Sequence, residues 1–434
     1  MFSKILIANR GEIAVRIIRA CKEMGISTVA VYSEADRDTL HVNLADESYC
    51  IGPAPASESY LNQERVISAA LVSGAQAIHP GYGLLSENPE FARKCEKNGI
   101  VFIGPSVQCM EKISDKTAIK DIIASTGLRA IPGSGVLEGV DDALARAKEI
   151  GYPVMLKARS GGGGRGIRLI NDEESLEREY PLAVSESEAA FADGALYIEK
   201  YVYPANHVEV QVLADEAGNV LCLGERDCSV QRHHQKLIEE SPAPSVPASR
   251  RQELFENVAD AVRQLGYTGV GTLEFLYDKQ GNFWFMEMNV RLQVEHSVSE
   301  MLTHKDIVKW QIRTAAGVTL NFTQESIPLN GCAIECRINA LRPGKLKLLH
   351  VPSGPFVRFD SFLVAGDEIT PYYDSLVGKM IVYAGTREEA IRKMKASLCE
   401  LVIDGIETNI DEQLKIVSSP AFSGGTYDLT LLEE

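Results

Sequence analysis

The sequence contains no apolar run of the ~18 residues that a membrane-spanning helix requires, and aromatic residues make up only 7% of the chain. The hydrophobic fraction of 45% nevertheless excludes a disordered or low-complexity protein. Basic residues are also in deficit, because 44 Lys and Arg stand against 60 Asp and Glu, for a net charge of -16. That balance argues against a nucleic-acid or membrane-surface binder, so any phosphate site has to be local.

Cysteines are scattered rather than arranged in a disulfide framework, and their number, nine, is odd. The nearest pairs, Cys222 with Cys228 and Cys332 with Cys336, lack both CxxC spacing and histidines at zinc-site intervals. The start of the chain lacks the basic and then apolar pattern of a signal peptide, and it does not resemble a transit peptide. We therefore interpret the cysteines as structural thiols and expect a cytoplasmic protein.

The usual dinucleotide fingerprint is missing from the first turn. Residues 4–9 form a short apolar run, and apolar residues at helical spacing follow from Ile13 to Cys21, which predicts a strand, a turn and a helix. The turn between them carries only Gly11 instead of GxGxxG, which disfavours a nicotinamide cofactor. Further buried strands are predicted at 29–32, 75–78 and 100–103. Residues 1–113 are therefore predicted to form a doubly wound α/β domain.

The rest of the chain divides into two α+β regions, so the 434 residues make about three domains, as ~150 residues per domain suggests. The second region, residues 114–329, has helical patterns near 116–125, 141–150 and 250–265. The third, residues 330–434, has strand patterns near 333–338 and 378–384 and helical patterns near 387–402 and 408–417. A turn-rich segment at 79–88 follows a strand end of the first region and, taken alone, is interpreted as structural.

Four consecutive glycines, residues 161–164, follow Lys157, which lies on a predicted strand. A loop without Cβ atoms lets backbone N–H groups approach phosphate oxygens, and the lysine adds a positive charge. The Walker ending GK[ST] is absent, so this is a different kind of phosphate loop. A flexible linker usually lacks flanking strands, and we therefore favour phosphate binding.

Two apolar segments joined by residues 278–282 are typical of a β-hairpin. This pairing places Glu274 opposite Glu287, and two facing carboxylates repel each other unless a cation lies between them. Asn289 shares the face of Glu287 by the strand period of two and adds a neutral oxygen. Hard oxygen ligands on a rigid hairpin predict Mg²⁺ or Mn²⁺ bridging phosphates. Solvated edge charges are the weaker alternative.

The same alternation continues beyond the hairpin, so an extended chain points Arg291, Gln293 and Glu295 towards the metal. Residues 231–236 contain four titratable groups and suggest an anion pocket, although a surface or capping role for each of their histidines remains open. Arg337 lies on a predicted strand with Glu335 on the same face. A structural ion pair between these two residues and a functional role for Arg337 are both open at this point.

These motifs together resemble biotin carboxylase, the ATP-grasp subunit of acetyl-CoA carboxylase and related biotin-dependent carboxylases. The resemblance extends over essentially the whole chain. It rests on residues 7–14 (IANRGEIA), 79–83 (HPGYG), 151–154 (GYPV), the glycine loop, 225–232 (ERDCSVQR), 287–289 (EMN), 293–296 (QVEH), 335–340 (ECRINA) and 404–409 (DGIETN). It implies a Rossmann-like N-terminal domain, a central ATP-grasp domain with a mobile lid at about 131–203, and a C-terminal α+β domain.

The resemblance also implies roles for individual residues. The residues implied to bind ATP are Lys116, Lys157, Gly161, Gly162, Gly163, Gly164, Arg165, Gly166, Glu199, Lys200, Val202, His207, Gln231 and His234. The implied metal ligands are Glu274, Glu287 and Asn289, for two Mg²⁺ or Mn²⁺ ions. The implied bicarbonate and biotin pocket consists of Lys236, Arg291, Gln293, Val294, Glu295 and Arg337. Among these, Glu295 is the implied general base and Arg337 the residue beside the biotin ureido oxygen, with Lys236 and Arg291 also catalytic.

The implied activity is MgATP-dependent carboxylation of biotin by bicarbonate through carboxyphosphate, the first half-reaction of a carboxylase that serves acetyl-CoA in fatty acid biosynthesis. The alternatives are a subunit that serves pyruvate or propionyl-CoA, another ATP-grasp ligase, and a non-catalytic homologue. No Ala-Met-Lys-Met biotinylation motif is present, so we expect biotin on a separate carrier protein and carboxyltransferase subunits as further partners. A homodimer is also expected, because Arg19, Glu23 and Arg358 match interface positions of dimeric members.

The sequence departs from the family pattern at two places that bear on the site. Ser297 stands where the family has proline, and the segment after Ala340 is shorter than in other members. Neither departure removes a catalytic group, but the second changes the expected shape of the third region.

Overall fold

The protein is described here by a computed structural model of residues 1–114, 116–160, 166–191 and 193–433. The first part of the chain forms a five-stranded parallel sheet with the order β3-β2-β1-β4-β5. Its strands are β1 (Lys4–Ile7), β2 (Ser27–Ser33), β3 (Glu47–Gly52), β4 (Ala77–His79) and β5 (Val101–Phe102). The doubly wound sheet predicted from the sequence is confirmed, although β3, a polar strand at the sheet edge, was not predicted.

Burial on both faces of this sheet explains its continuous apolar strands. Ile5 and Ile7 pack into one hydrophobic cluster, whereas Leu6 between them packs into another. The helices around the sheet are α1 (Gly11–Glu23), α2 (Leu40–Leu44), α3 (Gln63–Ser73), α4 (Pro89–Lys97) and α5 (Val107–Ser114). Local signals start them, as at α4, where the Asn88 side chain accepts from the backbone of Phe91 and Pro89 occupies the first turn.

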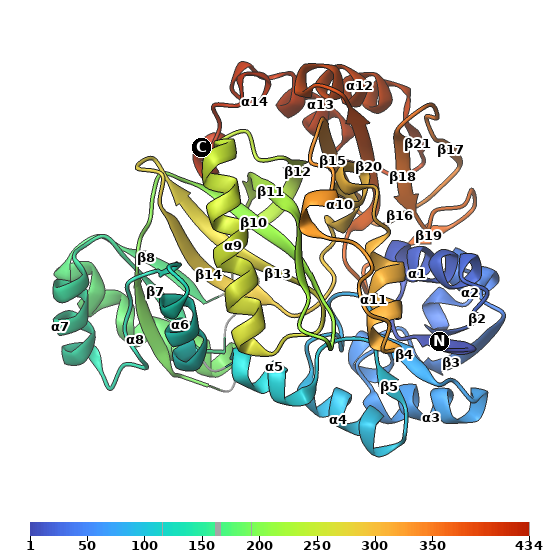
Figure 1. Ribbon diagram of the computed structural model, residues 1–434, viewed down its shortest axis with the longest axis horizontal. Helices are drawn as coiled ribbons and strands as arrows, with labels where there is room; N and C mark the ends of the chain where they lie inside the picture. The colour runs from blue at the N-terminus through green and yellow to red at the C-terminus, as the bar shows by residue number, and fades with distance from the viewer. Residues whose placement is uncertain (115, 161–165, 192, 434) are drawn as a thin grey trace.

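A nine-stranded sheet with the order β18-β20-β15-β12-β11-β10-β13-β14-β6 forms the centre of the molecule (Figure 1). Its strands are β6 (Arg129–Ala130), β10 (Ala205–Ala214), β11 (Val220–Arg232), β12 (Gln235–Ser241), β13 (Gly269–Asp278), β14 (Phe283–Asn289), β15 (Cys332–Asn339), β18 (Val357–Ser361) and β20 (Leu376–Ala384). The helices α6 (Lys116–Ser125), α9 (Ala248–Leu265), α10 (His296–Thr303) and α11 (Ile307–Ala315) belong to the same part of the chain. The predicted helices near 116–125 and 250–265 and the predicted hairpin are confirmed.

A small lobe stands apart at the left of Figure 1 and has its own core. It contains the sheet β8-β7-β9, built from β7 (Val154–Ala158), β8 (Ile167–Ile170) and β9 (Leu196–Lys200). Helices α7 (Val140–Ile150) and α8 (Glu173–Phe191) belong to the same lobe. The long helix α8, with Pro181 inside it, was not predicted. The lobe coincides with most of the segment that the resemblance implies as a lid.

The last hundred residues complete the central sheet and cover it at the top of Figure 1. Strand β12 pairs with β15, so the sheet runs without a break across residue 330, where we placed the start of the third region. Helices α12 (Arg387–Glu400), α13 (Ile410–Ser418) and α14 (Pro420–Gly424) follow, with two short sheets formed by β16 (Gly344–Lys345), β19 (Glu368–Ile369), β17 (Leu348–His350) and β21 (Val402–Asp404). The three-part division of the chain stays a proposal.

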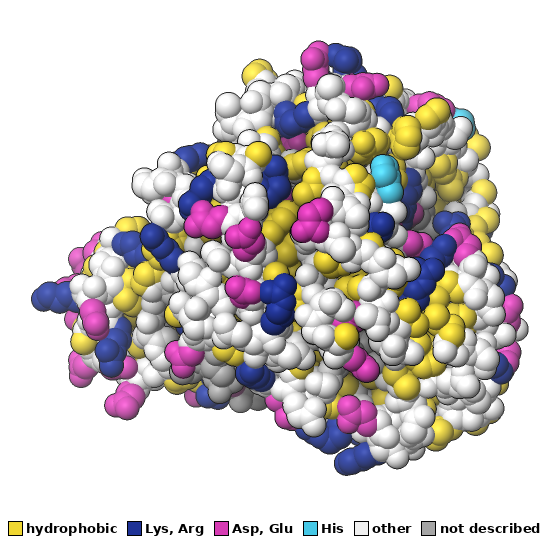
Figure 2. Space-filling view, in the orientation of Figure 1, with side chains coloured by type: hydrophobic (Ala, Val, Ile, Leu, Met, Phe, Trp, Pro, Cys, Tyr) yellow, Lys and Arg dark blue, Asp and Glu magenta, His cyan; other side chains and the backbone are white. Residues whose placement is uncertain are grey.

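The surface agrees with the balance of charge in the sequence. Acidic and basic side chains are interspersed over the face shown in Figure 2, so the net charge of -16 is not gathered into one patch there. Within the described ranges, no helix is both long enough and apolar enough to cross a lipid bilayer.

Candidate functional site

A chain of buried charges of alternating sign crosses the central sheet. Lys236 on β12 lies 2.6 Å from Oε1 of Glu295, and Arg337 on β15 donates to Oε2 of the same carboxylate at 2.9 Å. Glu209 on β10 accepts from the other side of Lys236 at 2.7 Å, and Glu239 accepts from Arg337 at 2.6 Å. The strand order β10-β11-β12-β15 brings these four strand residues together, and the turn after β14 adds Glu295.

Burying these charges costs free energy, because each charged group loses its hydration and must be paired with an opposite charge. Glu295 is 1% exposed, and burial alone would raise its pKa. Lys236 and then Arg337 outweigh that effect and hold the pKa of Glu295 well below 4.5. Glu295 is therefore ionised, with a donor on each of its oxygens, and the structure brings together two residues assigned to bicarbonate and one assigned to biotin.

The predicted metal ligands meet on the hairpin. Glu274 and Glu287 are direct partners in the register of β13 and β14, as the sequence pattern predicts. Oε1 of Glu274 accepts from Asn289 at 2.7 Å and from Gln293 at 2.9 Å, and Oε2 lies 2.8 Å from His207. Burial opposes ionisation of Glu274, but Lys236 and His207 outweigh it and lower its pKa. The side chain of Glu287 is open to solvent, which leaves an entrance for a cation beside two hard carboxylates.

Arg291 and His207 connect this cluster to its surroundings. Arg291 donates to Asn289 at 3.0 Å and to Gln293 at 2.8 Å, and it forms an ion pair with Glu87 at 3.1 Å. Nδ1 of His207 lies 2.7 Å from the amide nitrogen of Gln231. Arg291 and Gln293 thus contact two of the predicted metal ligands, Asn289 and Glu274, whereas Glu295 turns to Lys236 and Arg337.

The small lobe contributes a separate pair of predicted nucleotide residues. Lys157 on β7 donates to Glu199 on β9 at 2.6 Å, and Lys120 lies 3.4 Å from the same carboxylate. Burial raises the pKa of Glu199, but the two lysines outweigh it and lower the pKa. Lys157 and Glu199 thus form a charged pair on neighbouring strands, in which Lys157 is half-buried and Glu199 is buried.

The remaining predicted ATP-binding residues lie away from the Lys157–Glu199 pair or outside the described residues. Lys200 donates to the carbonyl oxygens of Gly151 at 2.7 Å and Tyr152 at 3.3 Å, so its ammonium group holds the α7–β7 turn. His234 is exposed in the turn between β11 and β12, and Val202 is half-buried after β9. Gly161, Gly162, Gly163, Gly164 and Arg165 lie outside the described residues, as does the side chain of Lys116. Gly166 has a positive φ of 73°.

Three buried charged residues of the site were missed in the sequence: Glu209, Arg226 and Glu239. Arg226 is 0% exposed and donates to Glu209 at 2.6 Å, which in turn holds Lys236. The parity of β10 was a usable signal, because Glu209 follows His207 by two residues and shares its face. Glu239 gave no such signal, because its partner Arg337 lies 98 residues away in the sequence.

The contacts of Arg337 show which carboxylates it pairs with. It pairs with Glu239 and Glu295, whereas Glu335 accepts from the hydroxyl of Ser297 at 2.5 Å. The Arg337–Glu335 pair, one of the two alternatives left open, is therefore not the one that forms, and the partners of Arg337 are Glu239 and Glu295. Arg337 points towards the carboxylate implied as the base.

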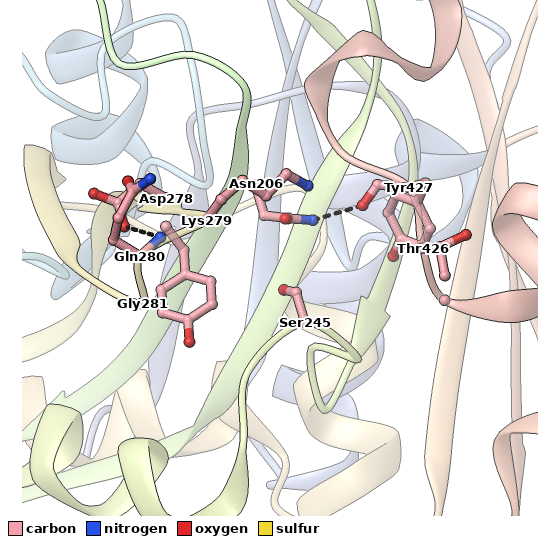
Figure 3. A pocket seen from close by; sticks show the side chains of 10 residues that line it. Asn206, Ser245, Asp278, Lys279, Gln280, Gly281, Thr426 and Tyr427 are labelled. Carbon is pink, nitrogen blue, oxygen red and sulfur yellow. Dashed lines mark hydrogen bonds between the residues drawn. The ribbon is translucent and has the colours of Figure 1, made fainter.

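A cavity of about 510 Å³ is lined by none of the predicted site residues (Figure 3). Its lining comes from the β13–β14 turn and the segment after α14, and Asn206 donates there to the carbonyl oxygen of Tyr427 at 2.9 Å. Because successive residues of a strand face opposite ways, Asn206 points away from His207. This cavity is therefore on the other face of β10 from the charged site.

Comparison with known proteins matches the whole chain to one family. Residues 1–110 match the family model "Biotin carboxylase, N-terminal domain", residues 115–323 "Carbamoyl-phosphate synthase L chain, ATP binding domain" and residues 335–434 "Biotin carboxylase C-terminal domain". The biotin carboxylase of Pseudomonas aeruginosa is 50% identical over 443 residues, covering 100% of this chain and 98% of that protein.

Two solved structures are similar over their whole length. A biotin carboxylase–β,γ-ATP complex from Campylobacter jejuni has a TM-score of 0.97 and 50% identity and covers 100% of this chain and 98% of its own. The biotin carboxylase domain dimer of the Hydrogenobacter thermophilus 2-oxoglutarate carboxylase, in complex with MgADP and bicarbonate, has a TM-score of 0.96 and 48% identity. It covers 100% of this chain and 97% of its own.

Proposed function

Because the chain belongs to the biotin carboxylase family and is an ATP-dependent ligase, we propose that Glu295 is the base that activates bicarbonate for attack on the γ-phosphate of ATP. The observation that carries this proposal is the position of Glu295 between Lys236 and Arg337. A buried, ionised carboxylate between two cations supports this role, because the cations can bind an anion beside a group that can accept its proton. The product of this first step is carboxyphosphate, with ADP released.

The low pKa of Glu295 is compatible with a base once the substrate charge is counted. A carboxylate that holds two cationic donors is a weak proton acceptor. Bicarbonate is itself an anion and accepts hydrogen bonds from Lys236 and Arg291. When Lys236 donates to bicarbonate, it no longer donates to Glu295, and the basicity of Glu295 rises. The proton of bicarbonate then passes to Glu295 as its oxygen attacks phosphorus.

The second step carboxylates biotin. Carboxyphosphate breaks down to CO₂ and phosphate, the phosphate removes the proton from N1 of biotin, and N1 forms the new bond to CO₂. Negative charge develops on the ureido oxygen of biotin, where Arg337 donates hydrogen bonds and stabilises it. Lys236 and Arg291 hold the bicarbonate, and Gln293 and the backbone of Val294 complete its pocket.

The hairpin residues fit a divalent cation. Glu274 and Glu287 face each other directly, an arrangement of like charges that a cation between them stabilises, and Asn289 adds a neutral oxygen. We propose that Glu274, Glu287 and Asn289 hold Mg²⁺ or Mn²⁺, with two ions in the complete site. When bound, the ions offset the charge of the triphosphate. The crystal complex of the Hydrogenobacter relative with MgADP supports this assignment.

ATP itself is proposed to lie between the central sheet and the small lobe. Lys116, Lys157 and residues 161–166 are the proposed phosphate contacts, and Glu199, Lys200 and Val202 line the adenine end. His207, Gln231 and His234 complete the site. The β,γ-ATP complex of the Campylobacter relative, at 50% identity, supports a nucleotide in this fold.

The deciding experiment is bicarbonate-dependent ATP cleavage by the purified chain with and without free biotin. A biotin carboxylase releases ADP faster when biotin is added and forms carboxybiotin from labelled bicarbonate. Another ATP-grasp ligase, with the same metal carboxylates and glycine loop, releases ADP without a response to biotin. That second outcome would replace our proposal with the ligase alternative.

The partners are proposed on the same basis. Biotin arrives on a separate carrier protein, and carboxyltransferase subunits pass the carboxyl group to acetyl-CoA, with a keto acid as the alternative because one 48% identical relative belongs to a 2-oxoglutarate carboxylase. Copurification of the chain with its carrier and transferase, followed by assays with acetyl-CoA, propionyl-CoA, pyruvate and 2-oxoglutarate, identifies the acceptor.

A homodimer is also proposed, since the Hydrogenobacter relative was solved as a dimer. Of the three residues that suggested an interface, Glu23 forms an ion pair with Lys309 at 2.5 Å, and Arg358 pairs with Glu300 at 2.7 Å within the chain. Arg19 is exposed on α1. A monomeric mass in sedimentation at micromolar protein would contradict the dimer.

A further inference from the structure

Lys379, on β20, is a fully buried lysine that the proposed mechanism does not use. Its side chain is 0% exposed, although lysine is rarely buried without a specific partner. It stands directly opposite Arg337 in the register of β15 and β20. Because directly opposed residues of an antiparallel pair share a face, Lys379 lies beside the arginine of the proposed biotin site.

The ammonium group of Lys379 contacts two distant parts of the chain, the segment before and at the start of α10 and the helix α1. Nζ donates to the carbonyl oxygen of Val294 at 2.5 Å and to the hydroxyl of Ser297 at 3.0 Å. It also forms an ion pair of 3.5 Å with Glu12 on α1. Lys379, in the predicted region 330–434, therefore contacts residues of both other predicted regions, 1–113 and 114–329.

Acidic groups around Lys379 keep it charged. Burial would lower its pKa, but the acidic groups around it, Glu12 first among them, outweigh burial and raise the pKa. Glu12 is itself oriented, because the hydroxyl of Tyr82 donates to its Oε1 at 2.5 Å. The ammonium group is therefore a charged donor in a fixed place, and hydrogen bonds from charged donors are stronger than neutral ones.

The contact with Val294 has a direct bearing on the site. Val294 lies between Gln293, which contacts Glu274, and Glu295, which contacts Lys236 and Arg337. The residues of this stretch are not in a regular strand, and α10 begins only at His296. The path of the backbone here depends on contacts such as the one at the carbonyl oxygen of Val294.

We propose that Lys379 is a positioning residue for the bicarbonate pocket, which fixes the backbone at Val294 and, through Ser297, the start of α10. The inference rests on the proposed function, because it concerns the same pocket. Ser297 completes the arrangement, since its hydroxyl accepts from Lys379 and donates to Glu335 at 2.5 Å. If Lys379 were purely structural, its loss would lower stability without a specific effect on the KM for bicarbonate.

The test compares Lys379→Met and Ser297→Ala with wild type in bicarbonate-dependent ATP cleavage, with a melting curve for each protein. The control is Thr303→Val, which deletes a buried hydroxyl of the same helix that donates to the carbonyl oxygen of Ser299 at 2.6 Å. We expect the KM for bicarbonate to rise about tenfold or more in Lys379→Met and about threefold in Ser297→Ala, as the loss of a charged and a weaker hydrogen bond predicts. The KM for ATP should change less than about twofold, and Thr303→Val should match wild type.

Each outcome decides the matter. An unchanged KM for bicarbonate in both variants, or a loss in which kcat and both KM values move together with the melting temperature, would overturn the positioning role. If Lys379→Met does not fold, Ser297→Ala decides alone by the same criterion. A wild-type chain that cleaves ATP without a need for bicarbonate would overturn the proposed function itself, whereas an active wild type with unaffected variants overturns only this inference.

Discussion

Arg337 donates to Oε2 of Glu295 at 2.9 Å, so the two residues that we assign to separate chemical steps touch each other in the free protein. The opposite oxygen of Glu295 accepts from Lys236 at 2.6 Å. The base is thus held by one cation from the bicarbonate side and one from the biotin side. This geometry makes the two steps separable by mutation, because each partner can be removed without the other.

Glu295→Gln should abolish both products. Glutamine keeps the volume of the side chain but does not accept the proton of bicarbonate, so carboxyphosphate does not form. ADP release and carboxybiotin formation should fall together by about 10²–10⁴-fold, the contribution of one general base. Parallel assays of both products measure this. Normal ADP release in the variant would reject Glu295 as the base.

Arg337→Ser should uncouple the two products. Bicarbonate-dependent ADP release should persist at a substantial rate, since Lys236 still holds Glu295, while carboxybiotin formation should be lost because the ureido oxygen has no donor. The matching measurement is the ratio of carboxybiotin to ADP, together with a melting curve. If ADP release and carboxybiotin formation decrease equally and the protein is destabilised, the role of Arg337 is limited to its ion pairs with Glu239 and Glu295.

Glu287→Gln should weaken metal activation. The change removes one charge from an exposed ligand with little change of shape, so the Mg²⁺ concentration for half-maximal activity should rise by about tenfold or more. Activity should recover in part at high Mn²⁺. Glu96→Gln, an exposed carboxylate on α4 far along the chain from the hairpin, is the control. Identical metal activation curves for the two variants would show that Glu287 is a surface charge.

Glu335 predicts a dependence of stability on pH. Burial raises its pKa to about 8, and Lys379 only partly offsets the effect. Between the ordinary value of 4.5 and about 8, the folded protein therefore holds a proton that the unfolded chain has lost, so stability decreases as pH rises across this interval. Glu335→Gln stays neutral and lacks this loss. Its melting temperature should gain a few degrees relative to wild type between about pH 5 and about pH 8.

The difference in melting temperature between Glu335→Gln and wild type needs a control at another carboxylate. Glu96→Gln, at an exposed carboxylate of α4, is the matched control. A difference between Glu335→Gln and wild type that stays the same from about pH 5 to about pH 8 would contradict a raised pKa of Glu335.

Elements with a local pattern could be predicted from the sequence. The strand, turn and helix at the start of the chain follow from an apolar run and helical spacing, and the hairpin that pairs Glu274 with Glu287 follows from alternation and one short turn. The family resemblance added roles that spacing did not provide. Strand β3 was missed because its sequence is polar at the sheet edge, and α8 because Pro181 interrupts its pattern.

The sequence by itself therefore determined the fold class, the facing carboxylates of the hairpin and, through its motifs, the family. The tertiary structure decided the partners of the charged residues. Arg337 shares a strand face with Glu335, but it pairs with Glu239 and Glu295, because β12 lies next to β15 in the sheet. A cross-strand neighbour depends on the order in which distant strands assemble, and no local period encodes that order. Lys379 shows the same limit, since its buried charge is stabilised only where three distant segments of the chain meet.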